Sequence, residues 1–440
     1  MNKYVKLSEV CKISGRVGWK GYTVNDLRPN GPWVIGANDI TSTNILDLSE
    51  AKHISREKFE ESPEIKIEIN DILIVKVGST IGKIAIVDKD IGEATINPNT
   101  VLLKNCKINP HYLYYYLISS AGQQYIKNHS SASAQPALNQ KDLKEMPVKL
   151  FNSAIHNKIS NQLKAFNKKI DINKNINREL VNQAKAIYDY WFIQYDFPDK
   201  NGKPYKSSGG KMVYNEDLKR EIPIGWNVNE LGNEIEIKRG ISYKSVEIKG
   251  NGIPMINLNS FNLDGTYKES GVKMYSGKYA TKNLVKGGDL LIAVTDVTRN
   301  ADIIGKSILV PFYYDELVYS MDIAKVIPKE NLTESYLMML FNSEHYHNYI
   351  KWYASGTIVL HLNMDGMKWY KAELPPKSLL EKFDLIYKPI AKRIAETTKQ
   401  NNQLADLRDW LLPMLMNGQV TVKETEEHIN QAAEPQENYS

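Results

Sequence analysis

The stretch from Val75 to Val87, VKVGSTIGKIAIV, contains the residue types of a phosphate-binding loop: glycines, small hydroxyl side chains and a Gly-Lys pair beside an apolar run. A Walker A loop needs four residues between its first glycine and Gly-Lys, then Ser or Thr, then a helix. Here three residues separate Gly78 from Gly82, and Ile84 stands where the hydroxyl is needed. A β-branched run follows instead of a helical pattern, so the spacing argues against nucleotide binding.

A second copy of the stretch lies further along the chain and leads to the same conclusion. It contains Gly305-Lys306-Ser307, but Asn300 stands where the first glycine is required, and a β-branched run again follows. Both copies are therefore predicted to form strand–turn–strand hairpins. The Gly-rich turn and Lys83 or Lys306 could then approach a phosphate backbone.

Other patterns that would support catalysis are incomplete. The segment INPNT (96–100) is close to the Asn-Pro-Pro-aromatic loop of adenine N6-methyltransferases, but Asn99 replaces the second proline and Thr100 replaces the aromatic residue. No glycine motif for a methyl donor accompanies it. The 8 histidines show no metal-ligand spacing, and Cys11 and Cys106 fit no metal or redox spacing. We therefore expect no catalytic residues, no metal site and no cofactor in this chain.

Length and composition predict a globular protein of two or three domains, because the chain has 440 residues and is 42% hydrophobic. A net charge of +5 permits a nucleic-acid partner without requiring one. The N-terminal stretch has no apolar signal core, and no apolar run approaches the length of a membrane span. We expect a reduced, cytoplasmic protein without membrane contact.

The sequence is written twice. Residues 108–140 align without a gap on residues 332–364, so that Tyr112-Leu113 falls on Tyr336-Leu337 and Leu138-Asn139 falls on Leu362-Asn363. The period is about half the chain, which indicates a duplicated domain rather than a solenoid. Each copy is predicted to open with short strands, then a Tyr-rich amphipathic helix near 110–128 or 334–353, a polar loop and a closing proline. The expected strands are 33–40, 71–77, 83–87, 253–258, 289–294 and 306–310.

Each half ends in a heptad pattern typical of a coiled-coil helix. The first seam contains Ile159, Leu163, Phe166, Ile170, Asn173, Asn177, Leu180, Ala184, Ile187 and Trp191. The second seam contains Phe383, Tyr387, Ile390, Ile394, Thr397, Asn401, Leu404, Arg408, Leu411 and Leu415. Antiparallel pairing about a pseudo-two-fold axis is predicted, because only that pairing brings both polar centres together. Pro389 is expected to bend the second helix or to mark its true start.

The predicted organisation has six parts. Residues 1–150 form a first globular domain, 151–195 a spacer helix, 196–222 an ordered connector, and 223–376 a second globular domain. Residues 377–417 form a second spacer helix, and the polar, acidic stretch 418–440 is expected to be a disordered tail. The fold class is α+β, with two similar α/β domains joined by two long antiparallel coiled-coil helices.

Two segments carry a resemblance to a known family. KPYKSSGGKMVYNEDLKREIPIGW (203–226) and LRDWLLPMLMNG (407–418), together with the order of parts, make the chain similar to the specificity (S) subunit of type I restriction-modification systems. The resemblance covers about residues 3–420. It implies two target recognition domains, each of which reads one half of a split double-stranded DNA sequence, and helices that set the gap.

The resemblance also implies partners. Two modification subunits would bind S-adenosylmethionine and methylate adenine, and two restriction subunits would hydrolyse ATP, with Mg²⁺, and cleave DNA. The chain itself would be non-catalytic, in agreement with the incomplete motifs. Two alternatives from other classes stay open. One is a self-contained restriction–methylation enzyme, and the other is a coiled-coil tether without DNA readout.

DNA-contacting residues are ranked by chemistry alone, because base edges are read by polar side chains on exposed turns. The candidates in the first half are Arg16, Lys20, Tyr22, Asn38, Lys76, Ser79, Thr80, Lys83, Ser133 and Gln135. The candidates in the second half are Arg239, Tyr243, Lys244, Asn257, Asn259, Thr295, Arg299, Lys306, Thr357 and Asn363. A solvated or turn-forming role is the alternative for each one. The two sets fall on equivalent loops, which favours a binding role for the set.

Overall fold

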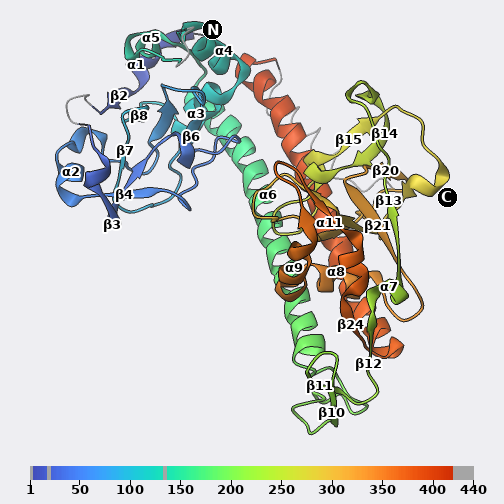
Figure 1. The fold of residues 1–440 in the computed structure, drawn as a ribbon. Helices are drawn as coiled ribbons and strands as arrows, with labels where there is room; N and C mark the ends of the chain where they lie inside the picture. Colours follow the sequence, from blue (N-terminus) through green and yellow to red (C-terminus); the bar gives the residue numbers. More distant parts are fainter. Residues whose placement is uncertain (1–2, 17–20, 132–135, 420–440) are drawn as a thin grey trace. The chain divides into compact units, whose positions relative to one another are not determined.

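The computed structural model describes residues 3–16, 21–131 and 136–419 (Figure 1). The chain divides into two compact units: unit 1 is Met1–Ile170 with Leu404–Ser440, and unit 2 is Asp171–Gln403. Each unit holds one α/β domain and one part of each of two long helices, α6 (Ser153–Tyr188) and α11 (Lys377–Asn417). Domain 1 extends from residue 3 to 150, and domain 2 from residue 227 to 374.

Domain 1 is built from a four-stranded sheet in the order β2-β8-β5-β6 and a three-stranded sheet in the order β4-β3-β7. All its pairs are antiparallel except β3 with β7. Its strands are β1 (Lys3–Lys6), β2 (Lys12–Gly15), β3 (Leu27–Ile35), β4 (Lys52–Ile54), β5 (Ile72–Val75), β6 (Ile84–Ile86), β7 (Ala94–Ile96), β8 (Thr100–Lys104) and β9 (Pro147–Leu150). Its main helices are α1 (Leu7–Val10), α2 (Arg56–Glu60), α3 (Pro110–Ile118), α4 (Ser120–His129) and α5 (Gln140–Glu145).

The central strand β5 shows why a continuous apolar run folds here as a strand. Successive side chains of a strand point to opposite faces, so a run of four apolar residues can bury both. Ile72 and Ile74 belong to the core against the helices, whereas Leu73 and Val75 belong to the core against the three-stranded sheet. All four are fully buried.

Domain 2 repeats this architecture with additions. Its sheets run β13-β21-β17-β19 and β15-β14-β20-β16, and a small sheet β18-β23-β22 is added. Its strands are β12 (Asn227–Glu230), β13 (Ile235–Arg239), β14 (Ile248–Ile256), β15 (Lys273–Tyr275), β16 (Leu284–Val285), β17 (Leu290–Ala293), β18 (Thr295–Asp296), β19 (Ser307–Leu309), β20 (Leu317–Tyr319), β21 (Ile323–Pro328), β22 (Ala354–Ser355), β23 (Leu360–Leu362) and β24 (Lys371–Leu374). Its helices are α7 (Leu231–Glu234), α8 (Glu334–Phe341), α9 (Glu344–Ile350) and α10 (Met364–Trp369).

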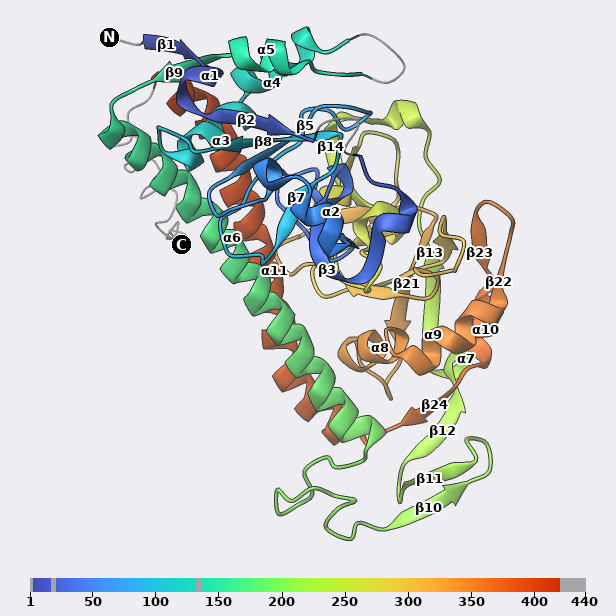
Figure 2. The same cartoon turned by 90° about the vertical axis from the view of Figure 1, so that its left-hand side faces the viewer.

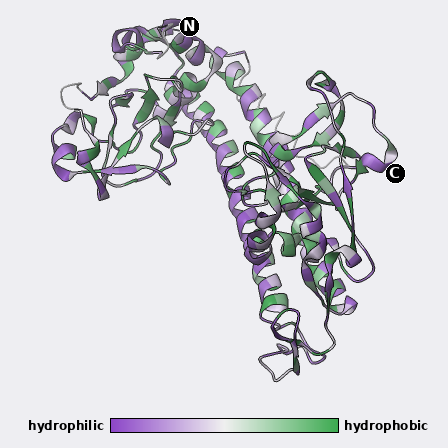
Figure 3. Cartoon of the chain, viewed as in Figure 1, coloured by the Kyte–Doolittle hydropathy of each residue, from purple (hydrophilic) through white to green (hydrophobic). Residues whose placement is uncertain are grey.

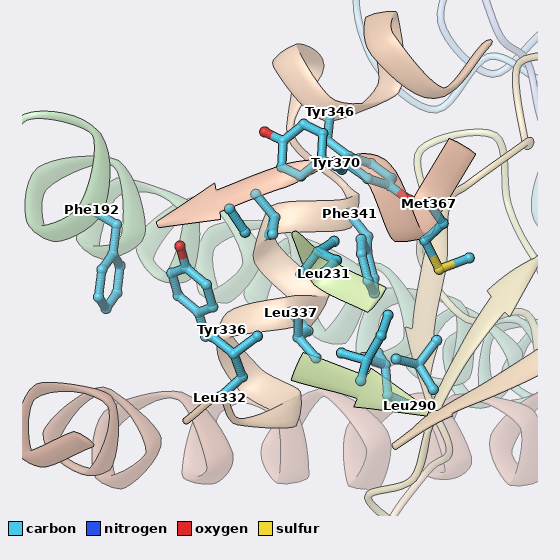
Figure 4. Packing of buried hydrophobic residues seen from close by; sticks show 14 of the residues in the cluster. Phe192, Leu231, Leu290, Leu332, Tyr336, Leu337, Phe341, Tyr346, Met367 and Tyr370 are labelled. Atoms are coloured by element: carbon cyan, nitrogen blue, oxygen red, sulfur yellow. The ribbon is translucent and has the colours of Figure 1, made fainter. Parts of the chain in front are cut away.

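The core of domain 2 is rich in aromatic rings (Figure 4). Phe192 lies in the π-helical turn Asp189–Ile193 that directly follows α6. Its ring centroid is 5.0 Å from that of Tyr336 and 5.2 Å from that of Phe383 on α11. Edge-to-face aromatic pairs add to the free energy that burial of their area contributes. The same contacts attach domain 2 to both long helices within unit 2.

The prediction of one long Tyr-rich helix in each copy is wrong. The first copy forms α3 and α4, which are separated at Ser119, and the second forms α8 and α9, which are separated at Asn342 and Ser343. Ser119 and Ser343 have extended backbone angles, and their hydroxyls accept from backbone N–H groups of the next helix. A serine at this position caps a new helix rather than continuing the old one.

The first and last strands of each domain pair with each other. Strand β1 lies antiparallel to β9, with Lys3 opposite Leu150, and β12 lies antiparallel to β24, with Asn227 opposite Leu374. This pairing closes each domain next to the start of its long helix.

The long helices pair antiparallel, as predicted. In unit 1 the first part of α6 packs on the last part of α11, where Leu163 and Leu411 are fully buried in the domain 1 core. In unit 2, Asn173 Nδ2 donates to Gln400 Oε1 at 2.8 Å and to Asn401 Oδ1 at 2.9 Å. Figure 3 colours many residues of both helices as hydrophilic, with hydrophobic residues between them.

The other polar seam residues complete this contact. Asn177 Nδ2 donates to Thr398 Oγ1 at 3.1 Å, and the Thr397 hydroxyl donates to Asn177 Oδ1. Residues near the middle of one helix thus meet residues near the middle of the other, as antiparallel pairing requires. Of the remaining seam positions, Ile159, Phe166, Ile170 and Phe383 are buried, and Leu180, Ile187, Ile390, Ile394 and Leu404 are half-buried.

Pro389 does not mark the start of the second helix. Helix α11 begins at Lys377, after Pro375-Pro376, and runs through Pro389 to Asn417. The proline ring is exposed, so its bulk meets solvent rather than the partner helix.

The connector after α6 is a folded segment. It contains the hairpin of β10 (Met212–Asn215) and β11 (Arg220–Pro223). Asp196 accepts from the backbone N–H of Ser207 at 2.7 Å, and the Phe197 ring stacks on Trp226 at 5.6 Å. Among the described residues, no helix is long and apolar enough to cross a membrane. The predicted tail lies almost wholly outside the described residues.

Candidate nucleic-acid interface

The turn between β5 and β6 is the first candidate surface, and its hairpin form is confirmed. Gly78 and Gly82 have φ values of 103° and 87°, a backbone conformation that residues with a Cβ rarely adopt. Ser79 is exposed and Thr80 is half-buried. Lys83 Nζ donates to the Ile40 carbonyl at 2.8 Å, so this lysine ties the turn to the neighbouring loop.

Lys76 begins the same turn and is half-buried. Burial holds the pKa of its ammonium below the ordinary lysine value, because desolvation disfavours the charged form. Its backbone carbonyl accepts from Leu138 N at 2.8 Å, which brings the loop after α4 against the turn. Tyr22 is half-buried and Asn38 is exposed.

Arg16 is a structural tie rather than an exposed cation. Its Nε donates to the Ile96 carbonyl and its Nη2 to Thr95 Oγ1, each at 3.1 Å, and its guanidinium lies 5.7 Å from the centre of the Tyr22 ring. The side chain is buried, and burial lowers the pKa of Arg16. Three candidates in domain 1, Lys20, Ser133 and Gln135, lie outside the described residues.

The loop between β18 and β19 is organised around one buried carboxylate. Asp296 is fully buried and accepts from the backbone N–H groups of Thr298 (2.6 Å), Ile303 (2.6 Å) and Ile304 (3.1 Å). Such bonds hold the loop in one conformation before any ligand arrives. Arg299 lies on the exposed outer side of this loop.

Basic side chains gather beside this loop. Burial, followed by repulsion from Lys351, lowers the pKa of the half-buried Lys306, although Asp264 opposes this. Burial, followed by Lys306 and Lys351, also lowers the pKa of His347, which Asp302 opposes. Like charges held together in the free protein are stabilised when a polyanion binds. Lys306, Lys351 and His347 form the basic cluster of domain 2.

The remaining candidates of domain 2 divide by exposure. Asn257 and Thr295 are buried, and Asn257 Nδ2 donates to the Gly271 carbonyl at 2.6 Å, which is a turn-forming role. Tyr243 is half-buried. The exposed candidates are Arg239, Lys244, Asn259, Thr357 and Asn363. DNA contact by any residue of either set stays a prediction.

Sequence reasoning missed two features of this candidate surface. The carboxylate of Asp296 was not singled out, although an Asp inside the second copy of the glycine-rich stretch is a signal for a pinned turn. The apolar tip between β22 and β23, with Ile358 and Val359, was also missed, because a polar rule for base contact passes over aliphatic side chains.

Two other findings concern catalysis. Cys11 and Cys106, which are far apart in the sequence, are neighbours in the fold: hydrogen bonding to the Cys106 sulfur, with burial, raises the pKa of the Cys11 thiol. In the methyltransferase-like segment, Asn97 Oδ1 accepts from Asn99 N and Thr100 Oγ1, so its side chain shapes a turn. Within residues 3–16, 21–131 and 136–419, no cluster of His, Cys, Asp and Glu could hold a metal ion.

The chain has two similar α/β domains, and each carries basic and polar side chains on its turns and packs on the paired long helices. This arrangement is that of a duplicated recognition protein. Residues 2–182 and 223–404 both match the model of the type I restriction modification DNA specificity domain. The chain belongs to this family, and it is a DNA specificity subunit of a type I restriction-modification system.

Similar proteins of known type agree with this assignment. The MjaIX specificity subunit of Methanocaldococcus jannaschii is 25% identical over 407 residues, which cover 89% of this chain and 87% of that protein. The HindI specificity subunit of Haemophilus influenzae is 22% identical over 472 residues, covering 91% and 99%. The crystal structure of an S subunit from M. genitalium has a TM-score of 0.57 at 14% identity, covers 94% of this chain and 96% of that chain, and shares the fold.

Proposed function

We propose that this chain reads a DNA target in two separated halves, one with each globular domain. The internal duplication carries the proposal: domains 1 and 2 have the same central sheet pattern and present equivalent turns, β5–β6 and β17–β19. A chain with two similar readers on one scaffold contacts two short sequences at once. The basic cluster of domain 2 supports a polyanionic ligand.

The long helices are proposed to hold partner subunits. Two modification subunits would bind S-adenosylmethionine and methylate adenine, and two restriction subunits would use ATP and Mg²⁺ to cleave DNA. This chain would contribute sequence readout and no chemical step. The turn-forming role of Asn97 supports that division of labour. We place the complex in the cytoplasm, where bacterial or archaeal DNA lies.

The proposal is tested by expressing the chain with its modification subunit and sequencing the methylated adenines in the host DNA. We expect one motif of two short specified halves around an unspecified gap. Replacing domain 2 with the domain 2 of a relative should change one half and leave the other unchanged. A single contiguous motif would contradict the proposal.

The same experiment separates the two alternatives. Methylation by the chain without a modification subunit would indicate a self-contained restriction–methylation enzyme. Assembly of the complex with methylation that ignores exchange of either domain would indicate a coiled-coil tether. The family model of a DNA specificity domain matches both domains, and this match supports the proposed function over either alternative.

A further inference from the structure

An apolar tip projects from domain 2 next to the loop that Asp296 organises. Strands β22 and β23 form a hairpin at the margin of the domain (Figure 2), and β23 also pairs with β18, with Asp296 opposite Leu360. The residues just beyond this pair, Val297 and Val359, therefore lie at the same end of the small sheet as the hairpin turn. We name Val297, Ile358 and Val359 the apolar tip.

The turn that carries Ile358 and Val359 requires a glycine at its start. Gly356 has a φ of +137°, and a Cβ there would lie 2.1 Å from the Val359 carbonyl oxygen, so a side chain does not fit. On the other side of the small sheet, the three backbone N–H groups bound by Asp296 fix the start of the neighbouring loop. Val297 thus begins a loop that these bonds preorganise, and Ile358 and Val359 follow a position that only glycine occupies without a clash.

The apolar tip is exposed to an unusual degree. Ile358 is 85% exposed, Val297 is 64% exposed and Val359 is 37% exposed. Single exposed aliphatic residues are normal, but a group of them on two adjacent turns marks a contact surface.

Charge selects the occupant of this surface. Arg299 follows Val297 by two residues and is exposed, and Lys306 ends the same loop. His347 on α9 lies beside this loop, with its Nδ1 3.1 Å from the Ile304 carbonyl oxygen, and Lys351 acts on the pKa values of both Lys306 and His347. A nucleic-acid backbone satisfies these cations, so the apolar tip is placed to meet base edges while the cluster meets phosphates.

In the major groove of DNA, the thymine 5-methyl group is the apolar feature of a base edge. We propose that Ile358, supported by Val297 and Val359, packs on the methyl group of a thymine in the half-site read by domain 2. This rests on the proposed function and goes beyond it, since it names one base and the group on it that is read. The aligned residues in domain 1 are Ala134 and Gln135, so the proposal is confined to one half of the target.

The test uses the full chain assembled with its modification subunit and a duplex that contains the methylated motif. Each thymine of the half-site read by domain 2 is replaced in turn by deoxyuridine, which lacks only the methyl group. We expect one position at which binding weakens roughly fourfold, the scale set by burying one methyl group. With Ile358→Ala, binding to the thymine and deoxyuridine duplexes should become equal.

Ile224→Ala is the matched control, because Ile224 is the same residue type, is 59% exposed, and lies in the connector rather than in domain 2. It should keep the preference for thymine. The inference is overturned if no position responds, if the half-site contains no A·T pair, or if Ile358→Ala keeps the preference. The inference is also overturned if the Ile358→Ala complex loses the modification subunit and keeps the preference for thymine, because the apolar tip would then bind a protein partner.

The outcome also separates this inference from the proposed function. If the assembly binds the split motif and deoxyuridine does not change its affinity at any position, the thymine contact is contradicted and the readout of two halves is not. An assembly without preference for any split motif removes both.

Discussion

Asp296 is the residue on which the loop between β18 and β19 depends. Its carboxylate is fully buried and its three partners are backbone N–H groups, which an acidic oxygen satisfies better than a neutral amide. A buried donor that loses its acceptor costs about 1–3 kcal/mol. The conformation of the loop therefore depends on this one side chain, and we expect a substitution there to disturb it.

We expect Asp296→Asn to lower the free energy of unfolding of unit 2 by about 1–3 kcal/mol and to weaken binding of the split DNA target. Urea denaturation and a binding titration measure the two effects. Asp302→Asn is the control, because Asp302 is half-buried in the same loop and its substitution removes the same amount of charge. Equal losses in both variants would mean that charge, and not the backbone bonds, is what matters.

His111 makes unit 1 sensitive to acid. Burial and then repulsion from Lys164 lower the pKa of this imidazole to about 4, while Asp88 acts in the opposite direction. The unfolded chain, with an ordinary histidine pKa of about 6.5, binds the proton more readily than the folded one between these two values. Stability from this residue is thus complete above about pH 6.5 and is lost as the pH falls toward 4.

We predict that the free energy of unfolding falls by up to about 2 kcal/mol more between pH 7 and pH 5 in the native sequence than in His111→Gln. Urea denaturation at the two pH values gives the difference. Parallel pH dependence of the two proteins would show that His111 does not carry the effect.

At the scale of the elements, the two long helices have an apolar seam with a polar middle. Asn173 is almost fully buried. The hydrogen bonds that its side-chain amide donates to Gln400 and Asn401 define which residues of α6 and α11 face each other. A buried polar contact of this kind selects register, since a shifted pairing would leave the amide unsatisfied.

Because the amides are direct partners, Asn173→Ala and Asn401→Ala should not be additive. We expect each single change to lower the free energy of unfolding by about 1 kcal/mol, and the double variant to lose less than the sum by about 0.5–1 kcal/mol. Denaturant unfolding of the four proteins in the cycle measures this coupling. Additive losses would show that the hydrogen bond between Asn173 and Asn401 does not contribute to the free energy of unfolding.

Seam positions in unit 1 are apolar and behave differently. Leu411 is fully buried among the domain 1 core residues. An aspartate there would be a buried, unpaired charge, so Leu411→Asp should destabilise unit 1 by several kcal/mol and abolish assembly with the modification subunit. Leu385→Asp, at a position of α11 that is 78% exposed, is the control for folding. Full methylation by Leu411→Asp would exclude a structural role for the seam in assembly.

At the scale of the whole molecule, both long helices are shared by the two units. A change in one helix alone therefore leaves the other helix with the wrong length for pairing. Inserting one heptad in α6 between Ile170 and Asp171, and a second in α11 between Gln403 and Leu404, keeps the seam in phase within each unit.

We predict that the double insertion leaves both half-motifs unchanged and lengthens the unread gap by about one to three base pairs, since seven helical residues add roughly 10 Å. Activity should weaken, because three base pairs also turn the second half by about a third of a turn. Sequencing the methylated sites decides the matter. The single insertion in α6 is the control and should lose activity; an unchanged gap with full activity of the double variant would show that the helices do not set the spacing.

The sequence by itself determined the duplication, the α+β fold class, the hairpins at 71–87 and 289–310, and the antiparallel helix pair. These follow from local periodicity and from the match of one half to the other, which need no knowledge of distant contacts. Single residues carry less. Ser119 and Ser343 look compatible with a continuing helix, and only their cap geometry shows that the helix ends there.

Only the tertiary structure decided which polar residues are available to a ligand. Arg16 and Asn257 are turned inward because neighbouring segments offer carbonyl and hydroxyl acceptors, whereas Arg299 is exposed on the loop whose backbone Asp296 holds. The proximity of Cys11 and Cys106 has the same origin, since strand pairing joins segments that are far apart in the sequence. Exposure and partnership are properties of folded neighbours, so residue types alone indicate a recognition surface without saying which of its side chains face the DNA.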